Sequence, residues 1–324
     1  MADLATFLAY PVSLLTIGGI YAVMCLGLNV QWGFTGLFNA GIAGFFAVGA
    51  YTSAILTTPA HPDYLGGFAL PVPVGLMAAM LTAGVVALFI GWLTLSLRSD
   101  YLAIATIGIA EILRLIVKNE DWLTNGPRGI PGIPRPFEGL SPFQNNLAFL
   151  LMVLAIVAVI YVAMQRGLNS PWGRVMRAIR ENELSARAAG KNIMARRLEA
   201  FVLGSMIMGL GGALMAHSIR FIGPEATEPL LVTFLVWVML IAGGSGNNRG
   251  AILGPMLIWA IWSLTELVTR QLPSDWALRS AYIRVFLIGL ALQIILQRFS
   301  RGILAERPPE PIPLDDGDRP TADR

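Results

Sequence analysis

Few side chains in this sequence could support catalysis or bind a metal ion. Cys25 is the single cysteine and lies in an apolar segment, and His61 and His217 are the two histidines. This set supplies neither a disulfide within the chain nor the four ligands of a zinc site. No HExxH or GxSxG motif and no pair of acids occurs in the apolar segments. We therefore expect a protein that is not an enzyme, in which Cys25 packs in the interior and His217 is an ordinary interfacial histidine.

A nucleotide-binding motif is also missing. The segment "SARAAGKN" (185–192) is similar to the end of a phosphate-binding loop, in which Gly-Lys is followed by Ser or Thr. Here Gly190 and Lys191 are followed by Asn192, and Ser185 stands where the motif requires its first glycine. We expect no cofactor in this chain, so any ATP that drives the protein must bind to a separate subunit.

Glu111 and Arg114 are charges within the apolar segment 101–118. An uncompensated charge at the centre of a bilayer costs about 2.5–3.5 kcal/mol on insertion scales, so such residues usually face protein or water and find partners. Their i,i+3 spacing places both on one face of a helix, where they can pair. Two interpretations follow: a buried ion pair that ties helices together, or a transport-pathway role for Glu111 together with Thr106.

The elements that hold these residues are predicted to be membrane-spanning helices. The 324-residue chain is 55% hydrophobic and 13% charged, whereas soluble domains carry about a quarter charged residues. Segments 4–60 and 64–97 contain no Asp, Glu, Lys or Arg, and a helix needs roughly 20 apolar residues to cross a bilayer. We predict an all-α, polytopic transmembrane helical bundle of about nine spans, within a range of about eight to ten. The spans are expected at about 8–30, 34–57, 68–97, 101–118, 146–165, 200–219, 229–246, 250–269 and 280–298.

The distribution of Lys and Arg predicts the orientation of the bundle. If the charged segment 166–199 faces the cytoplasm, thirteen Lys and Arg residues lie in cytoplasmic segments and six in outside segments. This bias places the N-terminus outside and the C-terminus inside, with the Gly- and Pro-rich segment 119–144 as a long outside loop. We expect residues 1–306 to form one transmembrane domain, and the acidic, proline-rich tail 307–324 to be disordered in the cytoplasm.

Polar residues and glycines cluster around the start of the second predicted span. Asn29, Gln31, Thr35 and Asn39 lie there among glycines. Small residues allow helices to pack closely in lipid, which is one interpretation. The other is a broken or re-entrant helix, which a membrane protein tolerates only where the backbone lines a cavity. In that case the candidate residues of a translocation pathway are Thr35, Asn39, Thr106 and Glu111.

The charged segment 166–199 holds eight Lys and Arg residues and three Glu in an otherwise apolar chain. Asn182 suits a helix N-cap, Glu183 suits a first turn in which the helix dipole favours an acid, and Gly190 suits the left-handed position after a helix end. The pattern predicts a short cytoplasmic helix, 183–189, between the fifth and sixth spans, rigid enough to press on a soluble partner. The alternative is that the charges act only as a topology signal.

Four blocks of sequence resemble the inner-membrane permeases of bacterial branched-chain amino acid ABC transporters, the LivM type. In order, they are "GLNVQWGFTGLFNAGIAGFFAVGAY" (27–51), "YLAIATIGIAEILRLIVKNEDWLTNGPRGIPGIP" (101–134), "RAIRENELSARAAGKNIMARRLEAFVLGSMIMGLGGAL" (177–214) and "GGSGNNRGAILGP" (243–255). The resemblance covers about 20–305. It departs at Gly244-Ser245-Gly246, where the family usually has Gly-Leu-Gly, and at Arg197, where a lysine is common.

The resemblance implies the permease subunit of an ATP-driven importer, which forms the translocation pathway in the bacterial inner membrane. In that family the charged loop docks into a cleft of the ATPase subunit. By position, the residues that would make this contact are Glu183, Ala186, Arg187 and Gly190. The implied partners are ATP-binding cassette subunits, a second homologous permease or a copy of this chain, and a periplasmic substrate-binding protein, while nucleic acid is not among them.

Branched-chain amino acids are the cargo that the resemblance implies. Urea, short amides and aromatic acids stay open as cargo of related permeases, because the resemblance assigns the selective choice to the binding protein. The alternative from another class is an ion-coupled secondary carrier. Such a carrier would need acids inside the membrane for coupling, and Glu111 and Glu266 are the candidates.

Overall fold

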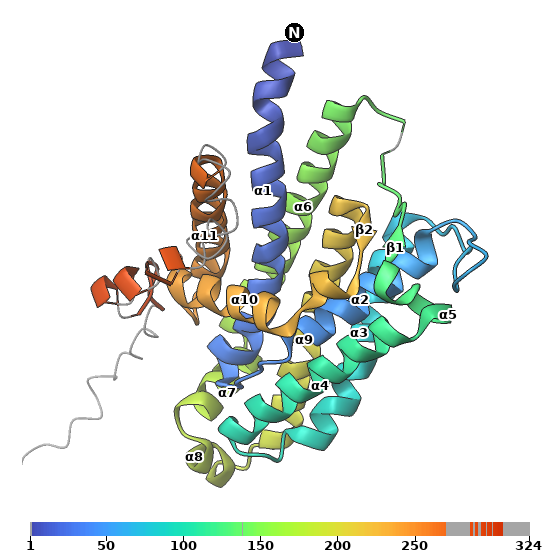
Figure 1. Ribbon diagram of the computed structural model, residues 1–324. Coiled ribbons are helices and arrows are strands. Elements are labelled where there is room, and N and C mark those ends of the chain that lie inside the picture. The colour runs from blue at the N-terminus through green and yellow to red at the C-terminus, as the bar shows by residue number, and fades with distance from the viewer. Residues whose placement is uncertain are drawn as a thin grey trace, which may run out of the picture.

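The computed structural model describes residues 2–137 and 139–269, and residues 286–306 except 288, 291, 292, 296 and 300. This part of the chain is a helical bundle, as predicted (Figure 1). Its long helices are α1 (Ala2–Leu28), α2 (Ile42–Thr57), α3 (Val72–Thr94), α4 (Ser99–Asn119), α6 (Pro142–Asn169), α9 (Ile193–Ile219), α10 (Pro229–Gly243) and α11 (Asn248–Thr269). They correspond to the first eight predicted spans. Most of the ninth, 280–298, and the whole predicted tail, 307–324, lie outside the described residues.

Among the described residues, four helical segments are long and apolar enough to cross a bilayer: Leu8–Gly33, α3, α6 and α9. Helix α2 and the Val232–Gly243 part of α10 are apolar but shorter. The outer surface of α3 exposes large apolar side chains such as Phe89 and Trp92. A surface of this kind would aggregate in water, whereas it suits contact with lipid tails.

Helix α9 is the central element and packs against α1, α2 and α3. Its glycines bring backbones into direct contact, as the close-packing interpretation predicted. A Cβ atom on Gly49 of α2 would lie 2.0 Å from the carbonyl oxygen of Gly209, and one on Gly204 would lie 2.5 Å from that of Gly27. These positions therefore exclude any side chain.

The loop before α6 is mostly turns, with short elements: α5 (Asp121–Thr124), the 3-10 helix η2 (Gly126–Arg128) and β1 (Ile130–Pro131). After α9, β2 (Phe221–Ile222) pairs antiparallel with β1, and the 3-10 helix η3 (Pro224–Thr227) leads to α10. His217, near the end of α9, is fully buried within the protein. Its ring lies 2.8 Å from the Ser53 hydroxyl and 2.7 Å from the Pro134 carbonyl oxygen, so it fastens this loop to α2 and α9.

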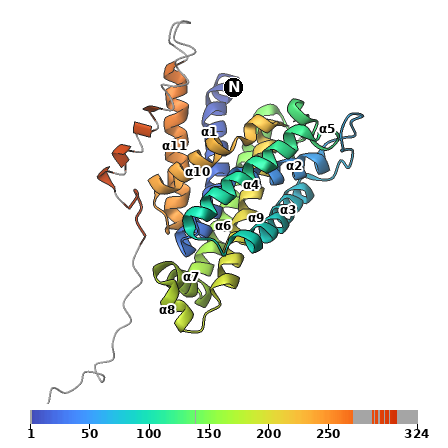
Figure 2. The ribbon, with the colours of Figure 1, turned by 60° about the horizontal axis from the view of Figure 1, so that its bottom comes forward.

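At the opposite end of α6, the chain forms α7 (Pro171–Glu181) and α8 (Glu183–Ala188). Figures 1 and 2 both show these two helices projecting beyond the bundle, at the end away from the start of α1. Met176 and Ile179 of α7 are buried, so α7 is packed against the protein rather than loosely attached. We refer to α7 and α8 together as the α7–α8 unit.

Candidate translocation and coupling sites

The helix that begins with α1 is broken near its end. The π-helix η1 (Asn29–Gly33) follows α1 directly, and residues 36–41 are not helical before α2 begins at Ile42. The predicted span 34–57 is therefore wrong in its first part, because Gly36 adopts φ +70°, which an α-helix cannot contain. A π-turn followed by irregular backbone is typical of a functional position within a membrane helix.

Gln31 holds the broken segment to α9. Its side-chain nitrogen donates to the Phe201 carbonyl at 2.8 Å and to the Ser205 hydroxyl at 3.1 Å. Its side-chain oxygen accepts from the Asn39 amide at 2.8 Å, and the Asn39 oxygen accepts from the Gly41 backbone N–H at 2.8 Å. Side chains thus satisfy backbone and polar groups that the broken helix leaves open, as burial in a membrane requires.

Asn29 joins the π-turn to the turn between α10 and α11. Its side chain donates to Asn248 Oδ1 at 3.0 Å and accepts from the Gly246 backbone N–H at 2.8 Å. Asn248 in turn donates to Gln165 of α6 at 3.2 Å. The turn between α10 and α11, the end of α6 and the break in the first helix therefore form one polar network.

The predicted pathway residues divide into two groups. Thr106 of α4 accepts a hydrogen bond from the Ala40 backbone N–H at 3.1 Å, which places it at the break beside Asn39. The Thr35 hydroxyl donates to the Gln31 carbonyl within its own helix. Thr35, Asn39 and Thr106 are buried, whereas Glu111 lies on another face of α4 and does not join them.

Glu111 and Arg114 form the predicted ion pair. Arg114 Nε donates to Glu111 Oε2 at 2.9 Å, and a second guanidinium nitrogen contacts the other carboxylate oxygen. The side chains of Glu111 and Arg114 keep 39% and 21% of their area exposed. Both partners belong to α4, and the pair is partly exposed rather than fully buried. Arg114 also interacts electrostatically with Glu228, which precedes α10.

The end of the bundle opposite the α7–α8 unit carries a second cluster of positive charge. A cavity of about 430 Å³ there is lined by Arg135 and Arg220 with residues of the α6 start. Arg135 donates to the Ser218 carbonyl at 2.6 Å and lies 5.8 Å from the centre of the Phe149 ring. Burial, and then the nearby charge of Arg220, lower the pKa of Arg135 from its ordinary value. The site brings positive charge to this end of the bundle.

Helix α8 has the predicted end signals. The Asn182 side chain accepts from the Ser185 backbone N–H at 3.0 Å, and Gly190 adopts φ +73° after the helix. The helix ends at Ala188, one residue before the predicted end. A second cap follows, because Asn192 accepts from the Ala195 N–H at 3.1 Å and starts α9. Side-chain caps therefore define the starts of both α8 and α9.

The predicted contact residues of α8 do not share one surface. Glu183 accepts from Arg187 and from Arg197 of α9, each at 2.9 Å, and so holds α8 against α9. Ala186 is buried against Ile179 and Ile193 and cannot reach a partner. Arg187 is 65% exposed, and Leu184, which was not predicted, is 76% exposed. The signal for Leu184 was an isolated large apolar residue within a charged loop.

Arg180 of α7 connects the α7–α8 unit to the break. Its guanidinium group donates to the Gly33 carbonyl, at the last residue of the π-turn. It also lies 2.8 Å from Glu306 Oε2 and 3.1 Å from Glu181 Oε1. Arg180 therefore links α7 directly to the backbone of the broken helix. The sequence carried no signal for this role, because Arg180 was one of eight similar charges.

Comparison with known proteins identifies the class to which this architecture belongs. Residues 10–296 match the family described as branched-chain amino acid transport system, permease component. The chain belongs to this family. It is a helical, polytopic membrane permease of the ABC transporter type, and the relatives it matches are transport proteins rather than enzymes.

Individual permeases of the family are similar over most of the chain. The high-affinity branched-chain amino acid transport system permease protein LivM of Escherichia coli K12 is 32% identical, with 92% of this chain and 71% of the relative covered. The probable branched-chain amino acid transport permease protein LivM of Methanocaldococcus jannaschii is 27% identical, with 90% and 92% covered. The autoinducer 2 import system permease protein LsrC of Yersinia pseudotuberculosis YPIII is 28% identical, with 71% and 64% covered. No solved structure matches the chain.

Proposed function

We propose that this permease imports branched-chain amino acids and is driven by a separate ATPase that docks on the α7–α8 unit. The observation that carries the proposal is the projecting α7–α8 unit with exposed Leu184 and Arg187, linked by Arg180 to a broken membrane helix. The cargo follows from the similarity to LivM permeases, which is greater than the similarity to the autoinducer permease.

Docking would use the exposed face of α8. Leu184 offers an apolar side chain to a cleft, and Arg187 beside it offers a charge that sets the register of the contact. Glu183 and Gly190 act indirectly: the first anchors α8 through Arg197, and the second forms the turn after the helix. Closure of the ATPase would push α7 and α8 together, since they pack as one unit.

The pathway would open at the break in the first helix. Movement of α7 pulls on the Gly33 carbonyl through Arg180, and the segment from Thr35 to Asn39 follows. Asn39 and Thr106 then break their hydrogen bonds within the protein and form hydrogen bonds with the zwitterionic cargo. Unwound helix ends bind substrate in this way in other carriers. Glu111, on the outer face of α4, would meet the second permease or lipid.

The remaining partners and the location complete the proposal. A second homologous permease, or a second copy of this chain, shares the pathway, and a periplasmic substrate-binding protein delivers cargo at the outer mouth beside Arg135 and Arg220. The protein spans the bacterial inner membrane several times, with the α7–α8 unit and the C-terminus in the cytoplasm. The excess of Lys and Arg in segment 166–199 supports this orientation.

Purification in mild detergent from a host that expresses the whole transporter tests the proposal. The wild-type chain should retain a stoichiometric ATPase subunit and take up leucine, isoleucine and valine, but not urea. Leu184→Asp and Arg187→Glu should reach normal membrane levels and lose the ATPase, while Arg128→Glu, a charge reversal in the loop before α6, should retain it. ATP-independent active uptake by the isolated chain in liposomes would contradict the proposal.

A further inference from the structure

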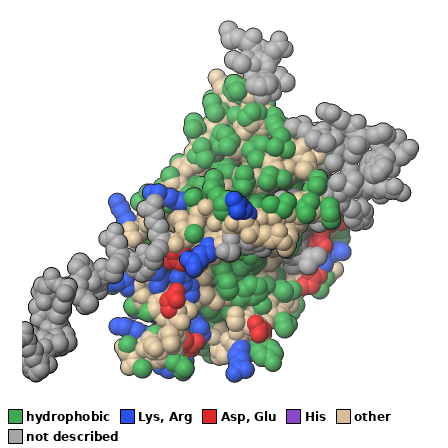
Figure 3. Space-filling view, turned by 90° about the vertical axis from the view of Figure 1, so that its left-hand side faces the viewer, with side chains coloured by type: hydrophobic (Ala, Val, Ile, Leu, Met, Phe, Trp, Pro, Cys, Tyr) green, Lys and Arg blue, Asp and Glu red, His purple; other side chains and the backbone are tan. Residues whose placement is uncertain are grey.

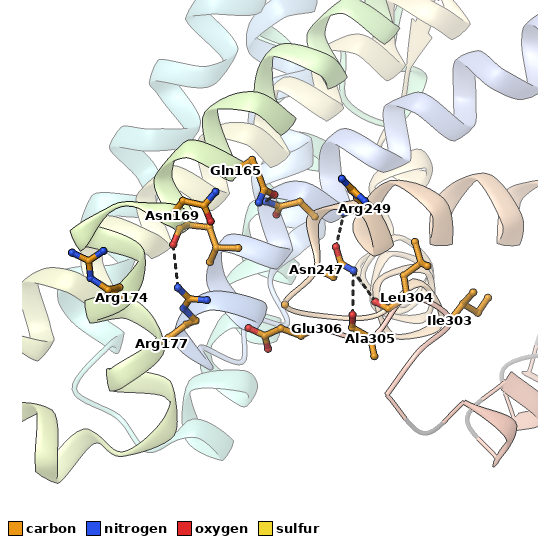
Figure 4. Close-up of a pocket in the computed structure, with 13 residues that line it drawn as sticks. Gln165, Asn169, Arg174, Arg177, Asn247, Arg249, Ile303, Leu304, Ala305 and Glu306 are labelled. Atoms are coloured by element: carbon orange, nitrogen blue, oxygen red, sulfur yellow. Dashed lines mark hydrogen bonds between the residues drawn. The ribbon is translucent and has the colours of Figure 1, made fainter. Parts of the chain in front are cut away.

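A basic cavity lies beside the α7–α8 unit, between segments that are distant in the sequence (Figure 4). Its volume is about 830 Å³. The walls are the end of α6, the first half of α7, the turn into α11 and the C-terminal segment 303–306. Hydrogen bonds from Asn247 to the Leu304 and Ala305 carbonyls, each 3.2 Å long, hold the C-terminal segment in place as one wall.

The charges around the cavity are unbalanced. Arg174 and Arg177 come from α7 and Arg249 from α11, whereas Glu306 is the one acid among the described residues of the lining. That acid is already paired, because Glu306 lies 2.8 Å from Arg180. The three lining arginines therefore have no carboxylate partner within the described part of the cavity.

These arginines also keep donors available. Arg177 donates one hydrogen bond to the Leu168 carbonyl at 3.3 Å, and Arg249 donates one to the Tyr161 hydroxyl at 3.3 Å. Arg174 makes no ion pair or side-chain hydrogen bond with the described residues. Because each guanidinium has five N–H donors in a planar fork, the cavity can bind an anion with several oxygens, above all a phosphate group.

Apolar side chains lie one helical turn away from two of the lining residues. Val162 of α6 comes one turn before Gln165, and Leu253 of α11 comes one turn after Arg249. Both are exposed apolar side chains. Figure 3 shows Lys and Arg side chains mostly in the lower half of one face, below a band of hydrophobic side chains. A molecule with a charged head and apolar tails would match this boundary.

We propose that this cavity binds the phosphate headgroup of an anionic phospholipid from the cytoplasmic leaflet, with its acyl chains along Val162 and Leu253. The inference rests on the proposed orientation of the α7–α8 unit. Basic pockets between membrane helices on the cytoplasmic side bind such headgroups. The bound lipid bridges α7 to α11 and holds the α7–α8 unit in its resting position, next to the contact between Arg180 and Glu306.

Lipid binding to the isolated chain tests the inference, because this measurement needs neither ATPase nor cargo. The chain is purified in detergent, and binding of phosphatidylglycerol, phosphatidylcholine and inorganic phosphate is followed by native mass spectrometry and by thermal stabilisation. We expect phosphatidylglycerol to bind and phosphatidylcholine to bind far less. Arg174→Gln with Arg249→Gln should weaken phosphatidylglycerol binding by roughly tenfold or more.

Two controls make the result decisive. Arg98→Gln with Lys191→Gln removes the same charge from exposed positions elsewhere and should leave lipid binding unchanged. Truncation after Glu306 removes the acidic tail and should also leave it unchanged. Equal losses in both double variants, binding that occurs only in the truncated chain, or stabilisation by inorganic phosphate as strong as by lipid would each overturn the inference. ATPase retention by the wild-type chain is a separate result, so failure here leaves the proposed function standing.

Discussion

The guanidinium group of Arg180 joins three segments that are far apart in the sequence. It contacts the Gly33 carbonyl in the first helix, Glu306 in the C-terminal segment and Glu181 beside it in α7. A planar fork of donors can serve these acceptors together, whereas a lysine ammonium acts as one compact charge. We therefore expect Arg180 to position the broken helix in addition to its part in the topology signal.

Replacement of Arg180 tests this role. In Arg180→Gln we expect normal membrane levels but roughly tenfold slower uptake in reconstituted transporters, since charge-assisted bonds to the Gly33 carbonyl and Glu306 are lost. ATP hydrolysis should continue near the wild-type rate, so less cargo moves for each ATP hydrolysed, and Arg180→Lys should recover only part of the coupling. Arg166→Gln removes an exposed arginine nearby and should behave as the wild type. Uptake by Arg180→Gln at the wild-type rate would show that Arg180 contributes only to the charge bias that sets membrane topology.

The ion pair of α4 leads to a second residue-scale prediction. Glu111→Gln leaves Arg114 without its carboxylate, and an unpaired arginine in a membrane helix costs about 2.5–3.5 kcal/mol on insertion scales. We expect lower expression or a lower Tm in detergent. The double variant Glu111→Gln with Arg114→Gln should recover most of the loss. A single variant that is stable but inactive would instead place Glu111 in the pathway.

Among the elements, α9 determines how closely the bundle can pack. Its glycines let α1 and α2 approach until backbone touches backbone, with Gly49 opposite Gly209 and Gly27 opposite Gly204. Because helix association in lipid depends on such packing rather than on the hydrophobic effect, the two contacts hold the broken segment between α1 and α2 against α9. Gln31 then adds its bonds to Phe201 and Ser205 at the same surface.

The addition of one methyl group at Gly49 tests the close packing of α2 against α9. Gly49→Ala places a Cβ atom 2.0 Å from the Gly209 carbonyl oxygen, so the helices must separate. Overpacking of this kind costs about 1–3 kcal/mol. We expect a lower Tm and less protein in the membrane. Gly108→Ala in α4 is the matched control, because nothing lies within 4 Å of its added Cβ. Similar stability of the two variants would show that α2 and α9 are not in close contact.

For the whole molecule, the orientation in the membrane decides which surface meets the ATPase. Cys25 is fully buried, so the native chain should give little background with a thiol reagent. We predict that a membrane-impermeant maleimide labels Arg128→Cys in intact spheroplasts and Ser185→Cys only in inverted vesicles. Both positions are exposed, so accessibility within the protein does not limit the reaction. The reverse labelling pattern would mean that the protein has the opposite orientation in the membrane. The α7–α8 unit would then lie outside the cytoplasm, where the proposed ATPase could not bind to it.

Much of the architecture could be predicted from short-range information. The length of charge-free runs predicted the spans, because the bilayer sets a minimum helix length. Asn182 and Gly190 predicted the boundaries of α8, since a cap depends only on residues within one turn. Tertiary structure decided the rest: Gln31 bonds to Ser205, Arg180 reaches Gly33, and Ala186 turns inward while Leu184 turns outward. These pairings depend on which helices pack together, and a long-range contact leaves no mark on the local spacing of residues.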